Sequence, residues 1–451
     1  MDSRHFHHAL KISDEICIGC SHCMSVCPTE AIRIRAGKAI LYENRCVDCG
    51  ECFKACPVSA ISIDQDDYNR IQNFRYRIAL VPAVFWGQFP EEISREQVYS
   101  AILANGFTHI YEVELSVDLL ASEINAYRKE RNPEKKPVIS SFCPAVIRLI
   151  QVKFPALTEN IMLLKPPLDI TALYCRKELT DQGINPAEIG VFYITPCAAK
   201  IAAIKSPVGE DYSMITGVIN MDILYNKVFK HIRNDRSAKT ATREQTISAK
   251  GLEWTLTHGE AKNISGRSLA IDEIHNVIEF LEKLESNEIG DIDFLELRAC
   301  DESCAGGALL SANRFLIAER LRNYSAKSSI DTKTSQNINK YTDYLLRRIS
   351  IQEINPRSMM KLDENMEEAM RKMDKSGQML NCLPLTDCGA CGAPNCQAFA
   401  NDIAQGEADI RQCIFIQKNR EQTGELTPEE SLDMLRGIWG SEKFFSNNKK
   451  Q

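Results

Sequence analysis

The chain has 451 residues and a net charge of −7, from 54 basic and 61 acidic side chains. This balance gives no electrostatic reason to expect nucleic acid or an anionic membrane as a partner, and no apolar run of about 18 residues suggests a membrane span or a secretory signal. With 44% hydrophobic and 25% charged residues, the composition is that of a globular protein of about two to four domains.

The use of cysteine points to metal binding. The chain has 18 cysteines, many of them at C-x2-C spacings that suit metal clusters better than disulfides, which are rare where thiols are kept reduced. We therefore expect a reducing, anaerobic cytoplasm. His5, His7 and His8 offer a metal-binding arm, but an N-terminal segment of this kind is expected to be unordered.

Two matching cysteine runs open the chain, and each reads C-x2-C-x2-C-x3-C-P. They comprise Cys17, Cys20, Cys23 and Cys27 before Pro28, and Cys46, Cys49, Cys52 and Cys56 before Pro57. The second run lies 29 residues after the first, and the flanking texts CPTEAIRI and CPVSAISI also agree. A zinc or disulfide module does not explain this spacing. The runs resemble those of bacterial ferredoxins, which bind paired [4Fe-4S] clusters.

In that resemblance the fourth cysteine of each run ligates the cluster of the other run. One cluster would then be held by Cys17, Cys20, Cys23 and Cys56, and the other by Cys46, Cys49, Cys52 and Cys27. His22 would tune or shield a cluster rather than ligate it. We expect an electron-carrying domain over residues 1–68.

The apolar run Ile78–Phe85 predicts a buried strand at the start of the next domain. From there to about residue 310, strand-like and helix-like stretches alternate, which predicts an α/β domain with a largely parallel sheet over 69–350. Short cysteine motifs follow strand-like runs at Cys197 and Cys300, and ligands collect at the ends of parallel strands. The polar stretch 237–246 is expected to be an exposed loop or insertion.

Four cysteines of this region lie far apart in the sequence, in the settings SSFCPAV, ITPCAAK and RACDESCAGG. They are Cys143, Cys197, Cys300 and Cys304. Together they can supply the ligands of one further [4Fe-4S] cluster, but scattered cysteines are also common as small buried apolar side chains. The residues alone leave both interpretations open.

These three segments resemble the three cysteine motifs of the [FeFe]-hydrogenase catalytic domain, and the resemblance covers about residues 1–320. It implies that the four cysteines hold a [4Fe-4S] cubane, bridged through Cys304 to a diiron unit that carries CO, cyanide and a dithiolate. Lys200 matches the lysine that holds a cyanide by a charge-assisted hydrogen bond. The implied reaction is reversible H2 oxidation and proton reduction, with hydrogenase maturation proteins as partners.

The largest departure from the family pattern is Phe142, which stands where the catalytic enzymes have a proton-relay cysteine. Phenylalanine has no exchangeable proton, and a positioned proton donor is worth about 10²- to 10⁴-fold in rate, so turnover should be slow. Ala203 lies near the position of a usual glutamate. Asp301, Glu302 and Ser303 replace Pro-Gly-Gly, and they could take part of the proton-transfer role or simply be solvated.

A third cysteine module reads C-x2-C-x4-C-x16-C. It comprises Cys388, Cys391, Cys396 and Cys413, with Gly389 and Gly392 expected to form a tight loop and Cys413 expected to return from the end of a helix. The spacing fits common zinc arrangements poorly. It resembles the four-cysteine [4Fe-4S] domain of corrinoid iron-sulfur proteins and electron-transport complex subunits. Cys175 and Cys382 remain, and we interpret both as structural thiols.

The C-terminal part divides into a helical linker (351–379), the [4Fe-4S] domain (380–420) and an amphipathic helix with a disordered tail (421–451). Thr427 to Glu430 predicts a capping box that begins the last helix. Its apolar face is a candidate docking surface for a partner and comprises Leu432, Leu435, Ile438 and Trp439. The final residues 446–451 are expected to be disordered.

The sequence therefore predicts an α+β and α/β multidomain chain: a ferredoxin-like domain, an α/β hydrogenase domain and a small C-terminal cysteine-loop and helix domain. Its cofactors would be four [4Fe-4S] clusters and the diiron unit. The resemblance favours the sensory branch of the [FeFe]-hydrogenases, with slow H2 or redox sensing and a ferredoxin or signalling protein as redox partner. Two alternatives are an ordinary bidirectional hydrogenase linked to ferredoxin and a non-catalytic electron-transfer or assembly scaffold without the diiron unit.

Overall fold

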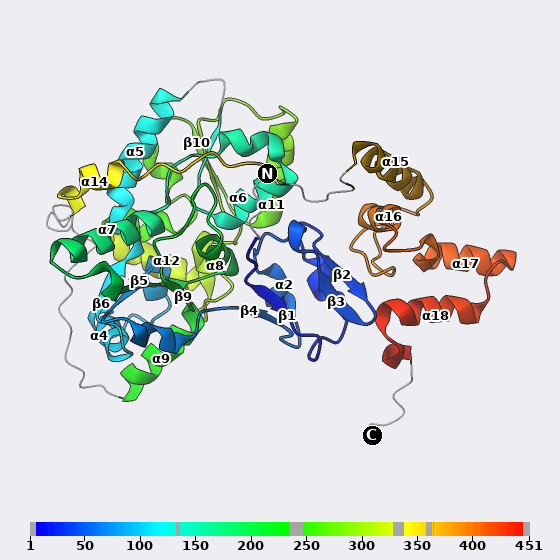
Figure 1. Cartoon of the computed structure of the whole chain (residues 1–451), viewed down its shortest axis with the longest axis horizontal. Helices are drawn as coiled ribbons and strands as arrows, with labels where there is room; N and C mark the ends of the chain where they lie inside the picture. Colours follow the sequence, from blue (N-terminus) through cyan, green and yellow to red (C-terminus); the bar gives the residue numbers. More distant parts are fainter. Residues whose placement is uncertain are drawn as a thin grey trace. The chain divides into compact units, whose positions relative to one another are not determined.

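The computed structural model describes residues 6–131, 136–234, 247–327, 338–357, 363 and 365–444. The loop predicted at 237–246 and the tail at 446–451 lie outside the described residues. Two compact units are present (Figure 1). Unit 1 comprises Met1–Ala9, Val47–Cys49 and Asp64–Pro356, and unit 2 comprises Leu10–Cys46, Gly50–Ile63 and Arg357–Gln451. Within the described ranges, no helix has the length and apolar character needed to cross a membrane.

Unit 1 is built on a four-stranded parallel sheet in the order β6-β5-β8-β9. Its strands are β5 (Tyr76–Val81), β6 (His109–Glu112), β8 (Ile189–Thr195) and β9 (Gly217–Asn220). Every residue of β8 is buried, as expected for an apolar run in a parallel sheet that is covered on both faces. Ile78 of β5 pairs with His109 of β6 and Val191 of β8. This sheet confirms the predicted parallel α/β domain.

The predicted strand at 78–85 is wrong in its second half. Strand β5 ends at Val81, and α3 (Ala83–Trp86) begins directly after Pro82. Proline has no N–H to donate to a sheet ladder and suits the start of a helix instead. The apolar character of residues 83–86 reflects a buried helical turn, because all four side chains are in the core.

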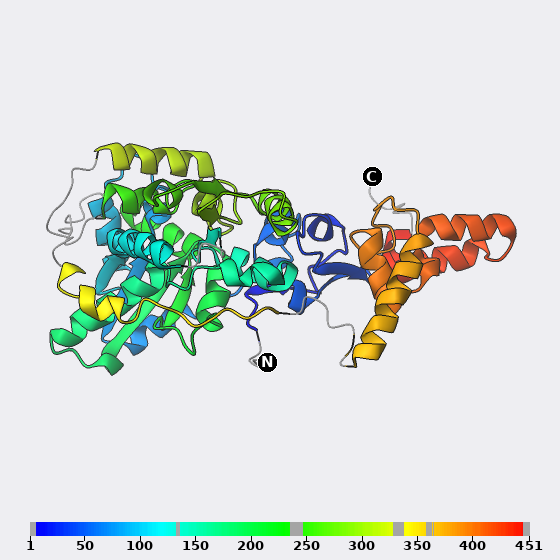
Figure 2. The ribbon, with the colours of Figure 1, turned by 90° about the horizontal axis from the view of Figure 1, so that it is seen from above.

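A second parallel sheet of unit 1 has three strands in the order β10-β11-β7. They are β7 (Val138–Ile139), β10 (Ser268–Ile271) and β11 (Phe294–Leu297). Figure 2 shows the helices that surround the strands of this unit. These helices are α4 (Arg95–Ala104), α5 (Val117–Glu130), α6 (Pro144–Lys153), α7 (Pro167–Asp181), α8 (Ala198–Lys205), α9 (Met221–Asn234), α10 (Ala249–Trp254), α11 (Ile274–Glu285), α12 (Arg314–Lys327) and α14 (Thr342–Leu346).

Helix α11 shows how the core of unit 1 forms. Its buried side chains recur at helical spacing, and they are Ile274, Val277, Ile278, Leu281 and Leu284. They join one apolar cluster with β7, β11 and α6. The cluster lies beneath the loops that follow β7 and β11, so those loops start from fixed positions.

Unit 2 contains two small antiparallel sheets and the cysteines of both N-terminal runs except Cys49, which belongs to unit 1. Strand β1 (Leu10–Ile12) pairs with β4 (Ile61–Ile63), and β2 (Ile32–Arg35) pairs with β3 (Lys38–Leu41). The short helices α1 (His22–Ser25) and α2 (Glu51–Ala55) lie within the runs. This is the expected ferredoxin-like arrangement.

The C-terminal part of unit 2 is helical and contains α15 (Met366–Asn381), α16 (Cys396–Gln405), α17 (Ile414–Thr423) and α18 (Pro428–Trp439). The region predicted as a linker, 351–379, is divided: the chain up to Pro356 belongs to unit 1, and α15 packs along α16.

Helix α18 begins at the predicted capping box of Thr427 and Glu430. Its apolar face packs on the chain's own β2, with Ile438 buried, and α18 lies next to β2 and β3 in Figure 1. Of the face predicted to dock a partner, Ile438 is thus buried within unit 2, and the other three side chains are half-buried.

Candidate metal centres

Three of the four scattered cysteines of unit 1 are placed at the carboxyl ends of parallel strands. Cys143 follows β7 and caps the N-terminus of α6, and Cys197 follows β8 and caps α8. Cys304 lies in a short helical turn, Ser303–Gly306, after β11. Strands β7 and β11 belong to the three-stranded sheet and β8 to the four-stranded sheet, and the carboxyl ends of parallel strands are where ligands bind in such folds. Helix N-termini there favour an anionic group.

The structure brings the thiols of Cys143, Cys197 and Cys304 together. Burial raises the pKa of Cys197 to about 12, and the neighbouring Cys304 and Cys143 add to the shift, whereas Lys200 opposes it. Cys300 is half-buried on the loop between β11 and the turn that holds Cys304. Four cysteines on three adjoining loops are the donor set of a [4Fe-4S] cubane, so the residues fit this group.

Lys200 lies on α8 beside the thiols. Its side chain is buried, and Nζ is 3.6 Å from the Sγ of Cys304. Burial alone would lower the pKa of Lys200, but Cys304, Tyr193 and the other two thiols raise it above its usual value. The lysine is therefore charged, and it can donate to an anion bound next to Cys304.

Phe142 fills the space next to this lysine. It is 5% exposed, and its ring centroid is 4.5 Å from Nζ of Lys200 and 3.8 Å from Cζ of Arg298. The backbone N–H of Phe142 donates to Oγ of Ser140 (3.2 Å), and that hydroxyl donates to Glu260 (2.6 Å). Arg298 donates to the same carboxylate at 2.9 Å. The ring thus lies against two cations, and its backbone is linked through Ser140 to the carboxylate that pairs with one of them.

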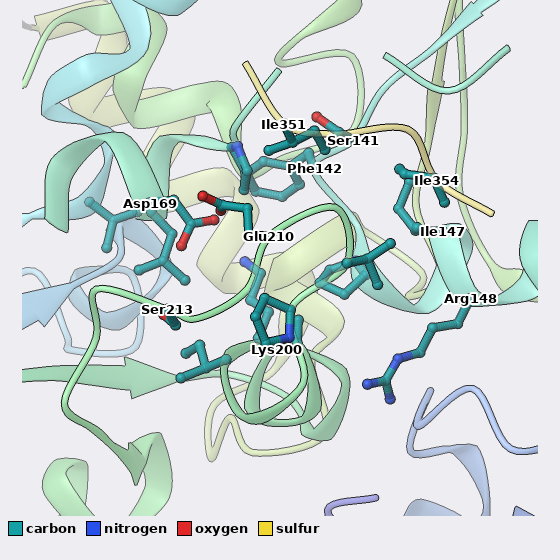
Figure 3. A pocket seen from close by; sticks show the side chains of 18 residues that line it. Ser141, Phe142, Ile147, Arg148, Asp169, Lys200, Glu210, Ser213, Ile351 and Ile354 are labelled. Atoms are coloured by element: carbon teal, nitrogen blue, oxygen red, sulfur yellow. The ribbon is translucent and has the colours of Figure 1, made fainter. Parts of the chain in front are cut away.

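A cavity of about 90 Å³ is lined by Phe142 and Lys200. Ala203 lines it, as do the carboxylates of Asp169 and Glu210, which point inward near Phe142 (Figure 3). Burial raises the pKa of Asp169 to about 6, although Lys165 and Lys200 act against the shift. Sequence reasoning missed both carboxylates, because nothing in their local sequence marks them.

Two more polar groups near Lys200 are buried. Burial raises the pKa of Glu114 to about 8, with Lys200 opposing the shift, and one of its oxygens accepts from the N–H of Ala83 at 2.9 Å. The hydroxyl of Tyr193 has no hydrogen-bond partner among the described residues. An unpartnered hydroxyl in this position marks a site that can accommodate a polar group.

The residues between Cys300 and Cys304 are held by arginines of α12. Asp301 pairs with Arg314 at 2.6 Å, and Glu302 pairs with Arg322 at 3.2 Å. Both acids are thus directed to the helix, whereas Ser303 is buried. Of the three residues, only Ser303 remains as a polar group buried next to Cys304.

The first ferredoxin-like set is assembled within unit 2. Burial raises the pKa of Cys23 to about 12, and Cys20, Cys17 and Cys56 contribute to the shift, so the fourth cysteine of the second run lies with three cysteines of the first.

The repeat is also visible in the hydrogen bonds. The N–H of Ala31 donates to Sγ of Cys27 and the N–H of Ala60 to Sγ of Cys56, each at 3.2 Å. N–H donors of this kind stabilise cluster sulfurs. In the second set, Cys46, Cys49 and Cys52 are buried, and their joint ligation with Cys27 stays a prediction. His22 is exposed.

The C-terminal cysteines line one small cavity in unit 2 together with Phe399. They are Cys388, Cys391, Cys396 and Cys413. Gly389 and Gly392 have φ values of +71° and +75°, which only glycine adopts readily, as the tight loop requires. Cys413 was expected to return from the end of a helix; it follows the short helical turn Ile410–Gln412 and begins α17, whereas α16 ends earlier, at Gln405. The four thiols fit a further [4Fe-4S] cluster.

The expectation of an unordered N-terminal histidine arm is wrong for His8, which is 4% exposed. Its Nδ1 lies 2.9 Å from Asp48, and Arg148 donates to the same carboxylate at 2.6 Å. Burial alone would raise the pKa of Asp48, but His8 and Arg148 hold it below its usual value. His7 is held through its backbone N–H, which donates to Ser206, and His5 lies outside the described residues.

The two remaining cysteines differ. Cys175 is fully buried, and its Sγ donates to the carbonyl of Ala172 at 3.3 Å, as suits a structural thiol. Cys382 is exposed at the end of α15, so the interpretation of a structural thiol is wrong there.

Three family models match parts of the chain. Residues 77–222 match the iron only hydrogenase large subunit, C-terminal domain, and residues 16–61 match the 4Fe-4S dicluster domain. Over residues 77–222, the chain thus carries a domain of the iron-only hydrogenase large-subunit family. Residues 383–415 match a family model for an Fe-S cluster. These matches agree with the predicted family resemblance and iron-sulfur domain content.

Two curated relatives are each described as a component of an ion-translocating oxidoreductase complex. The protein from Azoarcus sp. is 64% identical over 31 residues, and that from Thiobacillus denitrificans is 61% identical over 31 residues. Each match covers 7% of this chain and 17% and 16% of the two relatives, so the chain spans about a sixth of their length.

Solved structures of [FeFe]-hydrogenases are also similar. One, described for oxygen inactivation through the 2Fe subcluster of the H cluster, has a TM-score of 0.49 at 15% identity and covers 62% of this chain and 94% of that chain. A variant of HydA1 from Chlamydomonas reinhardtii has a TM-score of 0.47 at 14% identity, with the same coverage of 62% and 94%.

Proposed function

We propose that the protein is an iron-sulfur oxidoreductase of the [FeFe]-hydrogenase type that interconverts H2 with protons and electrons slowly, and that it senses H2 or redox state. The observation that carries this proposal is the environment of Phe142. A buried aromatic ring, without an exchangeable proton, lies against Lys200 next to the grouped thiols. The site therefore keeps the cation for an anionic ligand but lacks the proton relay.

Each residue of the central site has a defined part in this proposal. The four cysteines of unit 1 would hold the cubane, and Cys304 would also join it to the diiron unit. That diiron unit would supply the H2 chemistry. Lys200, charged and 3.6 Å from Cys304, would hold a cyanide of the unit by a charge-assisted hydrogen bond. Arg298 is paired with Glu260 and stays charged, so it cannot relay a proton.

The accessory sites would carry electrons to and from the central site. Unit 2 offers the C-terminal module and all the ferredoxin-like cysteines but Cys49, and the curated relatives are components of an oxidoreductase complex. We propose a one-electron partner, such as a ferredoxin or a signalling protein, together with maturation proteins that insert the diiron unit. A slow enzyme with several electron relays is better suited to reporting H2 than to consuming it.

The test is infrared spectroscopy in the CO and cyanide stretching region after anaerobic supply of iron, sulfide and a synthetic diiron precursor. We expect bands that shift when H2 is added and a low rate of H2 evolution with a low-potential dye. Clusters that stay oxidised under H2, although the diiron bands are present, would contradict the sensing proposal.

Two other functions predict different results. A bidirectional hydrogenase would evolve H2 rapidly, and replacement of Phe142 would change its rate little. A scaffold without the diiron unit would show no CO or cyanide bands while its cubanes remain intact. The retention of Lys200 beside Cys304 favours a diiron ligand set over the scaffold.

A further inference from the structure

The loop of the C-terminal cysteine module is fastened to the ferredoxin-like hairpin of unit 2. The N–H of Ile34 in β2 donates to the carbonyl of Gly392 at 2.8 Å. Arg35 donates to the same carbonyl at 3.0 Å and to that of Cys391 at 3.3 Å. A Cβ at Gly392 would lie 2.3 Å from the Ile34 carbonyl, so the close approach itself requires glycine.

A buried charge cluster supports this junction. Asp402 of α16 accepts two hydrogen bonds from Arg33, from Nε at 2.7 Å and from Nη2 at 3.0 Å. It accepts a third from Arg35 at 2.7 Å. The side chains of Arg33 and Asp402 are 0% and 3% exposed. A bidentate, buried pair fixes the relative position of the two elements, and removal of one partner leaves an uncompensated charge.

The two cysteine loops themselves meet. A Cβ at Gly389, which follows Cys388, would lie 3.2 Å from Cε of Met24, which follows Cys23. The last helix joins both sides: Trp439 donates to the carbonyl of Ala390 at 2.9 Å. Backbone N–H groups of residues 36 and 37 donate to the carbonyls of residues 437 and 438 at 3.0 and 2.9 Å.

We propose that the C-terminal cysteine site and the site of Cys17, Cys20, Cys23 and Cys56 form a fixed electron-transfer pair, with Asp402 as the positioning residue of the junction. A reduced cluster at one site gives one electron to an oxidised cluster at the other, and no bond or proton changes place. The two arginines and the one carboxylate of the junction have a net positive charge. This charge stabilises the reduced, more negative state of the clusters on either side.

The inference rests on the proposed cluster content of unit 2 but not on H2 chemistry. It assigns an entry point to the electron path. A one-electron carrier that meets the exposed Cys388 loop is connected to the ferredoxin-like domain without any movement of the module. The C-terminal module would then be a permanent terminal of the relay and not a mobile shuttle.

The experiment is electron paramagnetic resonance of the anaerobically reconstituted full chain reduced with dithionite. We expect the spins of the two clusters to broaden each other's signals and to speed each other's relaxation. A Cys391→Ser, Cys413→Ser variant that lacks the C-terminal cluster should narrow the ferredoxin-like signal. An unchanged ferredoxin-like signal in that variant would overturn the proposal, whatever the result of the H2 measurements.

The positioning role of Asp402 is tested by Asp402→Asn, with Asp433→Asn as the control. Asp433 pairs with Arg436 of its own helix at 2.9 Å and is 65% exposed. With iron and sulfide contents unchanged, Asp402→Asn should lower the rate of electron equilibration between the two clusters at least tenfold and weaken the spin interaction. The control should match the wild type. An Asp402→Asn variant with wild-type coupling would overturn the role.

Arg35→Gln provides a second variant if Asp402→Asn fails to incorporate clusters. It keeps the two hydrogen bonds between Arg33 and Asp402 and removes only the Arg35 contacts to Asp402, Cys391 and Gly392. We expect a smaller loss of coupling and a more negative reduction potential of the neighbouring clusters. Unchanged coupling together with an unchanged potential would count against the junction.

Discussion

Under the proposed function, replacement of Phe142 by cysteine should raise the rate of H2 evolution. The substitution places a thiol beside Lys200, where the resemblance to the catalytic enzymes puts a proton relay. Phe142→Ala removes the same ring and supplies no proton, so it is the matched control. The difference in rate between the two variants then isolates the thiol.

The expected magnitudes follow from the packing of the ring. A positioned proton donor is worth about 10²- to 10⁴-fold in rate, or about 3 to 5 kcal/mol of activation free energy. Both variants lose a ring that is 5% exposed and lies 4.5 Å from Lys200 and 3.8 Å from Arg298. Loss of a buried phenylalanine costs about 3 to 5 kcal/mol of unfolding free energy, part of it from the cation–π contacts. Cysteine and alanine should therefore destabilise the protein about equally.

The assay is anaerobic H2 evolution with a reduced dye, on chains loaded with a synthetic diiron precursor and matched for their infrared band intensity. Thermal unfolding of the three proteins is followed in parallel. We expect the rate of H2 evolution of Phe142→Cys to exceed that of both wild type and Phe142→Ala by about 10²-fold or more. Equal rates for the two variants would refute the reasoning, because the thiol would then raise the rate no more than removal of the ring does.

Three further outcomes are expected. Burial holds the pKa of Asp169 at about 6, against about 3.9 in an unfolded chain. The favourable contribution of Asp169 to the free energy of unfolding is therefore present at low pH and is lost as the pH rises through 6. Asp169→Asn should therefore stabilise the protein by up to about 3 kcal/mol at pH 8 and by almost nothing below pH 4, as denaturant melts at both values would show; an equal gain at both would contradict the assignment. Arg148→Met leaves the buried Asp48 without its 2.6 Å partner and should cost about 3 kcal/mol of stability, whereas a melting temperature equal to the wild type would mean that His8 and the Ala9 N–H suffice. Anaerobic chelation of iron should abolish hydrogen-exchange protection in α16 and α17, whose apolar core contains the cysteine side chains themselves, while β8 keeps its protection. Protection of α16 that survives chelation would show that the module folds without metal.

Periodic and spaced features of the sequence predict much of this fold. The ferredoxin-like repeat gives equivalent hydrogen bonds at Ala31 and Ala60, because the same residues at the same spacing fold in the same way. The capping box at Thr427 starts α18 at the predicted place, since a cap depends on only four residues. Features that depend on local sequence are the ones that local sequence can predict.

Other parts of the site depend on contacts between distant segments and could not be predicted. Arg298 reaches Phe142 from the position directly after β11, and Asp169 reaches the cavity from α7, with no sequence pattern to connect them. Helix α18 packs on β2, and the amphipathic pattern of the helix alone does not say which element its apolar face contacts. The strand predicted through Phe85 fails because Pro82 ends the ladder, a signal that was present in the sequence but outweighed by the apolar run.

The charges around Phe142 indicate which kind of side chain this position suits. Arg298 is balanced by Glu260 and Glu296, at 2.9 and 3.3 Å, so its charge is largely neutralised within that network. Of the two cations over the ring, Lys200 is the one whose Nζ lies 3.6 Å from Sγ of Cys304. A cation in this place would lower the pKa of a thiol at position 142 and so ease the release of its proton. The surroundings of Phe142 thus still suit an acid, and this is why Phe142→Cys is expected to gain activity with no second substitution.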